Sequence, residues 1–286
     1  MMLCVGAPST ADFVAGALLE VEERTAVGRL GSPLELRVAA FHRLCSGADI
    51  VAMEVPRAWQ ACLPAGTQLR MPAWVSQELC AAGKSPVTLP AAMRKEVRRH
   101  CRRNAYEVRF STDSNDIRHF YARLYRPYVS ARFGTGAVLV DEEHFLAVSR
   151  GMTLAMLTAA GEWVAGLLLR QHGETLHLGW FGSAAVPPRV GASEVLDAHS
   201  IEWGAARGVR RVIMGHSRPS LADGVVRYKS RFGATVRPTR FPQRTIGLLV
   251  QRWSPALVAS LDAARFVSFR GGKACVYRAQ PDPAMT

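Results

Sequence analysis

The 286-residue sequence lacks the features that mark disulfide-rich, zinc-binding and membrane-spanning proteins. Its six cysteines lie far apart without a Cys-x-x-Cys pair, which argues against zinc ribbons and disulfide scaffolds. No apolar run reaches the ~20 residues of a membrane-spanning helix. The N-terminal stretch has no basic region and meets Asp12 early, unlike a signal peptide. We therefore expect a cytoplasmic protein without a membrane span.

Motifs of several enzyme classes are also missing. The sequence has no Gly-x-Ser-x-Gly elbow and no Walker loop, which argues against hydrolases and nucleotidases. No His, Asp and Glu residues show the spacing of metal ligands, so we expect no metal. Internal repeats, low-complexity tracts and heptad stretches are absent as well.

An excess of positive charge is what the sequence does have. Lysine and arginine number 36 against 23 acidic residues, giving a formal net charge of +13. Such an excess favours acidic partners, namely nucleic acid, a phosphorylated cofactor or an anionic membrane surface. Hydrophobic residues make up 49% of the chain, enough for a substantial core.

The charge is concentrated between Pro86 and Arg109. On a helix, six cations of this stretch form two i, i+4 rows and hence a basic ridge: Arg94, Lys95, Arg98, Arg99, Arg102 and Arg103. A solvated connecting helix and a polyanion contact both fit this pattern.

The first ninety residues indicate a mixed α/β region. Residues 11–26 have helical spacing, and residues 32–44 suggest a strand followed by a short helix. Residues 49–56 predict a buried strand that Pro56 ends.

The pattern becomes more regular from Tyr106 onward. A strand is followed by a long helix that Asp113 or Ser114 caps and Pro127 bends, and then by a second, shorter helix. Three strands with short turns then predict a meander of hairpins at residues 152–158, 163–172 and 175–182. The remaining chain predicts helices at 192–207, 224–232 and 254–267 and strands at 210–215, 234–241, 244–253 and 273–279.

This order of elements from Tyr106 to about Trp253 resembles that of the GNAT acyltransferase fold. Four segments are similar to the branch that holds the Fem-type peptidoglycan aminoacyltransferases and polysaccharide-associated acetyltransferase domains: FYARLYRPYVSARFG, GEWVAGLLLRQHGETLHLGWFGSA, IEWGAARGVRRVIMGHSRP and GVVRYKSRFGA. The resemblance implies an α/β (α+β) fold with a mixed central sheet flanked by helices. It also implies a partial GNAT-like region at 1–92, a basic connecting helix at 93–105 and an acyltransferase domain at 106–286.

Acyl transfer to an amine needs a neutral amine, a stabilised oxyanion and a proton for the leaving group. The resemblance places the donor pyrophosphate at the loop before residue 192, where helix-start N–H groups attract anions. Arg189, Gly191, Ala192 and Ser193 are the candidates. Only one residue separates Arg189 from Gly191, which departs from the family's Gln/Arg-x-x-Gly-x-Gly/Ala spacing. A proline-glycine loop with a serine cap fits equally well.

The end of the predicted strand 210–215 offers further candidates. Catalytic groups of open α/β sheets lie outside the carboxyl ends of strands, so His216 is a candidate general base or substrate contact. Ser217 and Arg218 are candidates for binding donor or acceptor. Trp180 closes another strand and either lines a pocket or packs in the core. For His216, a loop histidine bonded to the backbone is the alternative.

The basic stretch GVVRYKSRFGATV supplies the last two candidates. By resemblance, Tyr228 would protonate a leaving thiolate, and Lys229 before Phe-Gly would contact donor phosphate or developing negative charge. A core aromatic and a solvated cation are the alternatives. Arg227 and Arg231 are interpreted as solvated.

The resemblance, together with these residues, implies an N-acyltransferase that moves an acyl group to an amine of a sugar, amino acid or metabolite. The donor would be acyl-CoA, with acetyl-CoA foremost, or a carrier-protein thioester. One alternative uses aminoacyl-tRNA as donor, which the net charge and the basic ridge favour. The other is a catalytically inactive domain that serves as a scaffold.

Overall fold

The computed structural model describes residues 1–18, 24–27, 45, 47–134, 139–185, 187–239 and 244–279. The chain forms two compact units, each built from separate segments. Unit 1 comprises Met1–Gln77, His216–Tyr228 and Val236–Thr286, and unit 2 comprises Glu78–Gly215 and Lys229–Thr235. The domain boundaries expected from the sequence resemblance stay a prediction.

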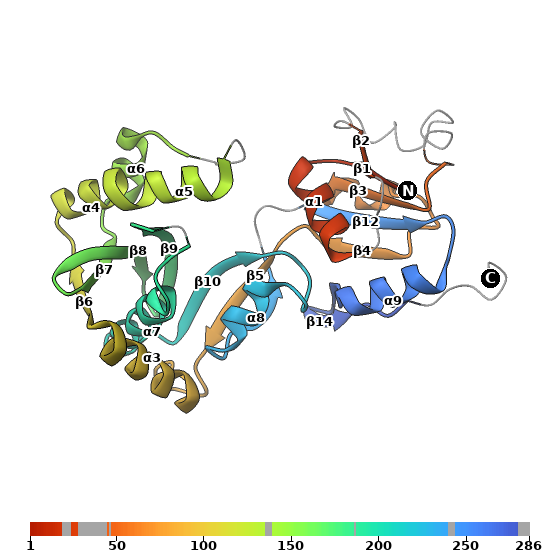
Figure 1. Cartoon of the computed structure of the whole chain (residues 1–286). Coiled ribbons are helices and arrows are strands. Elements are labelled where there is room, and N and C mark those ends of the chain that lie inside the picture. Colours follow the sequence, from red (N-terminus) through yellow and green to blue (C-terminus); the bar gives the residue numbers. More distant parts are fainter. Residues whose placement is uncertain are drawn as a thin grey trace. The chain divides into compact units, whose positions relative to one another are not determined.

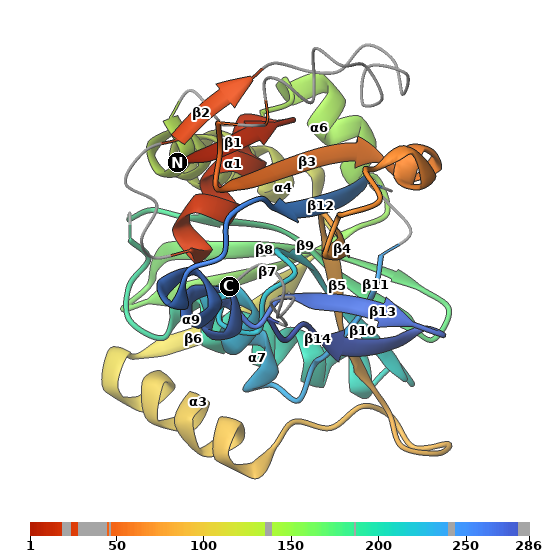
Figure 2. The same ribbon diagram turned by 90° about the vertical axis from the view of Figure 1, so that its right-hand side faces the viewer.

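A five-stranded sheet forms the centre of unit 1, in the order β2-β1-β3-β12-β4 (Figures 1 and 2). Its strands are β1 (Met2–Val5), β2 (Arg24–Val27), β3 (Ile50–Pro56), β4 (Leu69–Pro72) and β12 (Arg244–Val250). β1 runs parallel to both β2 and β3, whereas β12 is antiparallel to β3 and β4. The C-terminal strand β12 is therefore inserted between two N-terminal strands.

Helices cover this sheet with apolar side chains. Helix α1 (Pro8–Ala17) begins with proline at its first turn, where the missing N–H costs nothing. Its Val14 packs with Met71 and Phe266 in the buried core of the unit. Helix α9 (Pro255–Ala264) adds Leu261, and the 3₁₀ helix η2 (Arg57–Cys62) and the hairpin of β13 (Val267–Arg270) and β14 (Lys273–Val276) complete the unit.

Two sequence predictions in the N-terminal third have different outcomes. The predicted helix at 11–26 is wrong in its last residues, because α1 ends at Ala17 and Arg24–Val27 form β2. Pairing with Met2–Val5 outweighs helical spacing there, since a parallel neighbour satisfies the backbone groups of the short strand. The predicted strand and helix at 32–44 lie outside the described residues, whereas the predicted strand ending at Pro56 is confirmed.

Unit 2 contains most of a seven-stranded mixed sheet in the order β11-β5-β10-β9-β8-β7-β6 (Figure 1). The strands are β5 (Val75–Cys80), β6 (Tyr106–Ser111), β7 (Thr153–Ala159), β8 (Glu162–His172), β9 (Thr175–Ser183), β10 (Arg211–Ser217) and β11 (Thr235–Pro238). β6 to β9 are consecutive antiparallel neighbours, which confirms the predicted meander. β10 then pairs with β9 in parallel.

Helices lie on both faces of the meander (Figure 1). Helices α4 (Ser114–Phe120), α5 (Arg126–Phe133) and α6 (Glu142–Ser149) lie over one face, and α7 (Ala192–Ala205) with α3 (Ala91–Asn104) lies on the other. Asp113 caps α4 by accepting from the Asn115 N–H at 2.7 Å, as predicted. Between α4 and α5 the chain forms a π-helical segment, η3 (Tyr121–Tyr125), just before Pro127.

Among the described stretches of the chain, no helix is long and apolar enough to cross a membrane. The same residues contain no group of three or more His, Cys, Asp and Glu side chains that could hold a metal ion.

Candidate functional site

Strands β9 and β10 of unit 2 pair over only a short distance. Their parallel register joins Arg211 to Thr175, Val212 to Leu176 and Ile213 to His177, and it ends there. β9 continues to Ser183 on the β8 side alone, so its edge from Leu178 onward does not pair with β10. Backbone N–H and C=O groups of a strand edge can hydrogen-bond an extended ligand, as in strand addition.

A β-bulge lies on β9 where its pairing with β10 has ended. Leu167 of β8 is paired with Phe181 and Leu169 with Leu178, so Gly179 and Trp180 together oppose one residue of β8. A bulge re-aims the backbone groups of its strand and occurs often beside active sites. Glycine is needed here, because a Cβ at position 179 would lie 2.9 Å from the Leu168 carbonyl oxygen.

The N-terminus of α7 carries the predicted donor-phosphate residues. Gly191 is the N-cap residue with φ of 79°, a conformation that favours glycine, and Ala192 is buried. A Cβ at position 191 would lie 2.4 Å from the His100 ring, so the loop packs tightly on α3. The N–H groups of Ser193 and Glu194 have no backbone acceptor among the described residues. This helix start can therefore bind an anion.

The side chains of Tyr106, Asn104 and Glu162 contact the loop before α7. The Tyr106 hydroxyl and the Asn104 side-chain amide donate to the Val190 carbonyl at 3.1 and 3.4 Å. Burial raises the pKa of the Tyr106 phenol above its ordinary value, so it stays a neutral donor. Arg189 forms an exposed ion pair with Glu162 at 3.8 Å. Helix α3, which was expected to be a connecting helix, thus supports the candidate anion site through Asn104 and His100.

Lys229 is buried, with only 9% of its surface exposed. Its ammonium group lies beside Gly215 of β10, since a Cβ built at Gly215 would be 3.8 Å from Nζ. Gly215 has φ of 80° and lies just past the last β9–β10 pair. A buried ammonium costs free energy unless its surroundings provide hydrogen bonds or charge, which makes a solvated role for Lys229 a poor description.

Arg231 is exposed, as its interpretation as a solvated cation requires, but it is also paired with two carboxylates. Its guanidinium group pairs with Glu96 of α3 at 2.5 Å and with Glu194 of α7 at 3.6 Å. The contact with Arg231 holds the pKa of Glu96 below its ordinary value. Arg231 therefore connects the chain just after α8 (Gly224–Ser230) to both helices of this face, two residues from Lys229.

His216 and Tyr228 belong to unit 1, at the two points where the chain passes into unit 2. The His216 Nε2 and the Thr239 hydroxyl lie 2.9 Å apart, so this exposed histidine contacts a side chain. Tyr228 is half-buried on α8. Asp223 precedes α8, and its carboxylate accepts from the Val225 and Val226 N–H groups at the start of the helix.

Ser217 and Arg218 are engaged inside unit 1. The Ser217 hydroxyl donates to Gln77 at 2.5 Å, and Gln77 donates to the Val226 carbonyl at 3.1 Å. Arg218 donates to the Ser9 carbonyl at 2.6 Å and stacks over Trp74 at 4.0 Å. Burial lowers the pKa of the Arg218 guanidinium below its ordinary value. Both side chains have structural roles, and substrate contact for them stays a prediction.

The Trp180 side chain packs in the core of unit 2. It stacks on Phe145 at 4.7 Å between ring centroids and contacts Tyr125 at 6.0 Å. Of the two alternatives for this residue, core packing describes these contacts.

Sequence reasoning missed a buried carboxylate in unit 1. Glu54 accepts from Thr10 Oγ1 at 2.7 Å, the Ala7 N–H at 3.1 Å and Arg244 Nε at 2.6 Å. Burial alone would raise the pKa of Glu54, but these three donors hold it below its ordinary value. Glu54 lies in an otherwise apolar strand, and that was the only signal available in the sequence.

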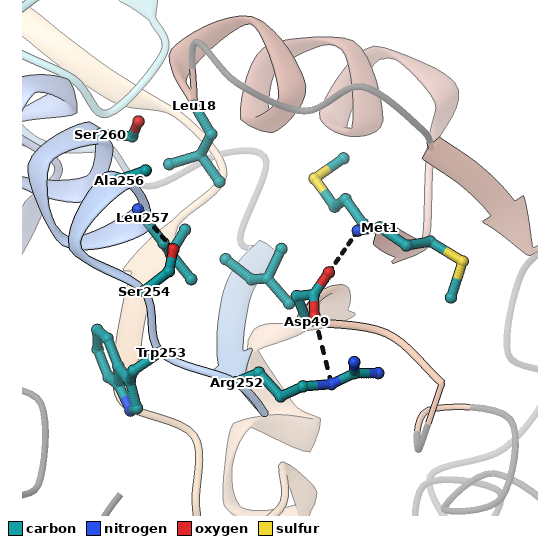
Figure 3. Close-up of a pocket in the computed structure, with 11 residues that line it drawn as sticks. Met1, Leu18, Asp49, Arg252, Trp253, Ser254, Ala256, Leu257 and Ser260 are labelled. Carbon is teal, nitrogen blue, oxygen red and sulfur yellow. Dashed lines mark hydrogen bonds and ion pairs between the residues drawn. The ribbon is translucent and has the colours of Figure 1, made fainter. Parts of the chain in front are cut away.

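Unit 1 also contains a small, mainly apolar pocket (Figure 3). It has a volume of about 170 Å³ and is lined by Leu18, Trp253 and Leu257 among others. Asp49 also lines this pocket, and it contacts the Met1 amine at 2.5 Å and Arg252 at 3.3 Å (Figure 3). These contacts hold the pKa of the Asp49 carboxyl below its ordinary value.

Comparisons with known proteins add to this geometry. A search of curated proteins found no match to this chain. Solved structures that are similar include L-PGS from Bacillus licheniformis, with 14% identity over 82% of this chain and 78% of that chain and a TM-score of 0.43. FemX has 9% identity over 74% and 76%, with a TM-score of 0.45. A GCN5-related N-acetyltransferase from Sphaerobacter thermophilus has 17% identity over 70% and 58%, with a TM-score of 0.41.

The decisive comparison is with a family model described as an acetyltransferase (GNAT) domain, which matches residues 91–230. The matched segment begins with α3 and ends with α8, and it includes β6 to β10 and α7. Its mixed sheet with helices on both faces confirms the fold class expected from the sequence. Residues 91–230 of this chain therefore match a GNAT-type acetyltransferase domain and have the GNAT fold.

Proposed function

We propose that this protein is an N-acyltransferase that moves an acyl group from a thioester donor to an amine of a small molecule or sugar. The donor is acyl-CoA, with acetyl-CoA the first choice, or a carrier-protein thioester. The observation that carries the proposal is the early end of the β9–β10 pairing beside a bulge, next to the buried ammonium of Lys229.

Each of these features supports one requirement of the reaction. Donor phosphates would bind at the start of α7, where the Ser193 and Glu194 N–H groups and the helix dipole favour negative charge. The edge of β9 past Leu178 would align the extended part of the donor. A phosphopantetheine thioester, when bound, supplies the activated acyl carbonyl. The residues present fit such a group, because the helix start has no side-chain cap that would compete with it.

In the transfer step the amine nitrogen forms a bond to the acyl carbonyl carbon, and the carbon–sulfur bond then breaks. The Lys229 ammonium would stabilise the oxyanion or the donor phosphates. His216 would remove a proton from the attacking amine, and Tyr228 would donate one to the leaving thiolate. Arg189, Ser217 and Arg218 stay secondary candidates for substrate contact.

Ligand-induced stabilisation of the protein tests the donor class. Melting temperature is measured against rising concentrations of acetyl-CoA, carrier-protein thioester and tRNA, because a ligand that binds the folded state stabilises it increasingly as its concentration rises above Kd. Stabilisation by acetyl-CoA or the carrier thioester is expected. If no donor of any class raises the melting temperature, the scaffold alternative replaces this proposal.

Variants of the stretch at Lys229 test the site. Lys229→Met is expected to lower kcat/KM by about 10²–10³-fold, the usual effect of losing one group that stabilises an oxyanion. Arg227→Gln, an exposed change two residues away, serves as the matched control. Circular dichroism must show that the Lys229 variant folds, and Lys229→Arg provides a variant that keeps the charge. Full turnover in both Lys229→Met and Tyr228→Phe would refute the site.

An aminoacyl-tRNA donor is the second candidate, and the exposed basic face of α3 favours it. Lys95, Arg98, Arg102 and Arg103 are exposed on this helix. Binding of tRNA through such a face would weaken steeply with salt, because phosphate contacts release counterions. A salt-sensitive shift with tRNA that Arg98→Gln and Arg102→Gln reduce, together with no response to acetyl-CoA, would establish this donor instead.

A further inference from the structure

A second, polar pocket lies entirely within unit 1, and none of its lining residues has an assigned role in the proposed acyl transfer. Its volume is about 340 Å³, and it is bounded by η2, β4, β12 and the hairpin of β13 and β14. The polar side chains that line it are Arg57, Gln60, Arg70, Thr239, Arg244 and Thr245. Small-molecule sites typically measure ~300–1,000 Å³, so this pocket is large enough for a metabolite.

The charges of this pocket do not balance. Three guanidinium groups line it, and its lining contains no aspartate or glutamate. Arg244 pairs with Glu54, whose side chain is only 4% exposed. Arg57 and Arg70 have no carboxylate within ion-pair distance among the residues that the structure describes. Within the described part of the chain, two positive charges at this pocket therefore have no fixed counter-charge.

The Glu54 carboxylate does not balance the positive charges of Arg57 and Arg70. Its Oε2 already accepts from Thr10 and Ala7, and its Oε1 accepts from Arg244. This network fixes the Arg244 guanidinium through Nε, while its side chain remains 39% exposed. The arrangement keeps one arginine rigid and leaves Arg57 and Arg70 exposed. Rigid guanidinium groups with planar donors suit the oxygens of phosphate.

Neutral donors and acceptors complete the lining. Thr245 donates to Gln60 at 3.4 Å, and the Thr239 hydroxyl lies 2.9 Å from His216 Nε2. Backbone groups of Gly271 and Gly272, in the turn between β13 and β14, also face the pocket. Glycine lets a ligand approach the backbone closely, because no Cβ intervenes.

We propose that this pocket binds a small phosphorylated molecule, whose phosphate dianion is held by Arg57, Arg70 and Arg244. The two uncompensated charges match the charge of the dianion, and the volume leaves room for the group that carries it. The proposal does not depend on the donor site of unit 2, because every lining residue belongs to unit 1.

Titration calorimetry at fixed ionic strength tests this proposal, with pyrophosphate as the probe. The full chain is compared with Arg57→Gln and Arg70→Gln, two exposed positions at which loss of a charge should leave the fold intact. Arg98→Gln removes one exposed arginine of α3 and is the matched control. Each pocket variant should bind pyrophosphate about 10-fold more weakly, because one charge-assisted hydrogen bond is lost. The control should bind as tightly as the unchanged chain.

Further titrations identify the kind of molecule that carries the phosphate group. Inorganic phosphate, a nucleoside diphosphate and a short RNA are titrated under the same conditions. A nucleoside diphosphate that binds more tightly than pyrophosphate, and loses that affinity in Arg57→Gln, supports a small-molecule ligand. Equal pyrophosphate binding in all four proteins, or binding of RNA alone, would overturn the proposal. Acetyl-CoA stabilisation is measured on the same variants and should be unchanged in Arg70→Gln, which separates this test from that of acyl transfer.

Discussion

Glu54→Gln gives a direct test of how unit 1 is held together. Glu54 joins three elements, because its carboxylate accepts from the start of α1 through Ala7 and Thr10 and from β12 through Arg244. The glutamine has nearly the same size and keeps one acceptor oxygen. If that oxygen faces Thr10 and Ala7, the new amide group must face the Arg244 guanidinium, and two donors then oppose each other.

The size of the effect follows from these contacts. Hydrogen bonds to a charged group contribute about 1.5–3 kcal/mol each, and breaking a buried ion pair costs about 3–5 kcal/mol. The Arg244 side chain is 39% exposed, so water replaces part of the interaction with Glu54 that Arg244 loses. The two hydrogen bonds from Thr10 and Ala7 weaken but persist. We therefore expect Glu54→Gln to lower the free energy of unfolding of unit 1 by about 2–3 kcal/mol at pH 7.

The effect should depend on pH in a defined direction. The pKa of Glu54 in the folded protein is held below its ordinary value of 4.5. A group of this kind stabilises the fold above pH 4.5, and its contribution is lost as the pH falls through the folded-state value. The difference between the unchanged protein and Glu54→Gln should therefore be full at pH 7 and shrink below pH 4.5.

Hydrogen exchange of the β3 and β12 amides measures the free energy of opening of this sheet at each pH. Glu174→Gln is the control, because Glu174 is 67% exposed and forms a surface pair with Arg210 that should contribute at most about 1 kcal/mol. The reasoning is refuted if Glu54→Gln costs no more than Glu174→Gln at pH 7. It is also refuted if the difference does not change between pH 7 and pH 3.5.

Three further predictions concern unit 2. Gly182→Ala should lower the free energy of unfolding by about 1–3 kcal/mol in urea denaturation, because its Cβ would lie 2.7 Å from the Tyr125 backbone. The control is Gly16→Ala, which has no atom near the new Cβ and should be neutral or stabilising. Equal effects of the two substitutions would contradict this prediction. Asp113→Ala should cost about 1 kcal/mol through loss of the α4 cap, and unchanged exchange of the Asn115 amide would disprove that role. Arg231→Gln should lower the melting temperature by a few degrees and reduce donor-dependent turnover, whereas retention of both would show that its pairs with Glu96 and Glu194 do not support the site.

The second half of the fold was accessible from the sequence because its elements are long and locally specified. Strand alternation and short turns define β7 to β9, and Asp113 marks the start of α4. The start of α7 at Gly191 follows from the glycine and its position after irregular sequence. Such signals are local, so no knowledge of distant contacts is required.

The remaining features depend on contacts between distant residues, which periodicity does not encode. Arg231 pairs with Glu96 across 135 positions, and Glu54 pairs with Arg244 across 190. The short strand Arg24–Val27 exists because Met2–Val5 lies beside it. The bulge at Gly179 had a weak sequence signal, a glycine inside a strand, but its location depends on the register with β8.

The insertion of β12 between β3 and β4 has a consequence for how the protein is made. During synthesis, β4 leaves the ribosome about 170 residues, and β3 about 190 residues, before the strand that must lie between them. Until then the edges that β3 and β4 will offer to β12 stay unpaired and are open to other strands. Contacts of such long sequence separation also slow folding. The sheet of unit 1 is thus completed only after β12 has been made, and a fragment that ends after α8 would lack the strand that joins β3 to β4.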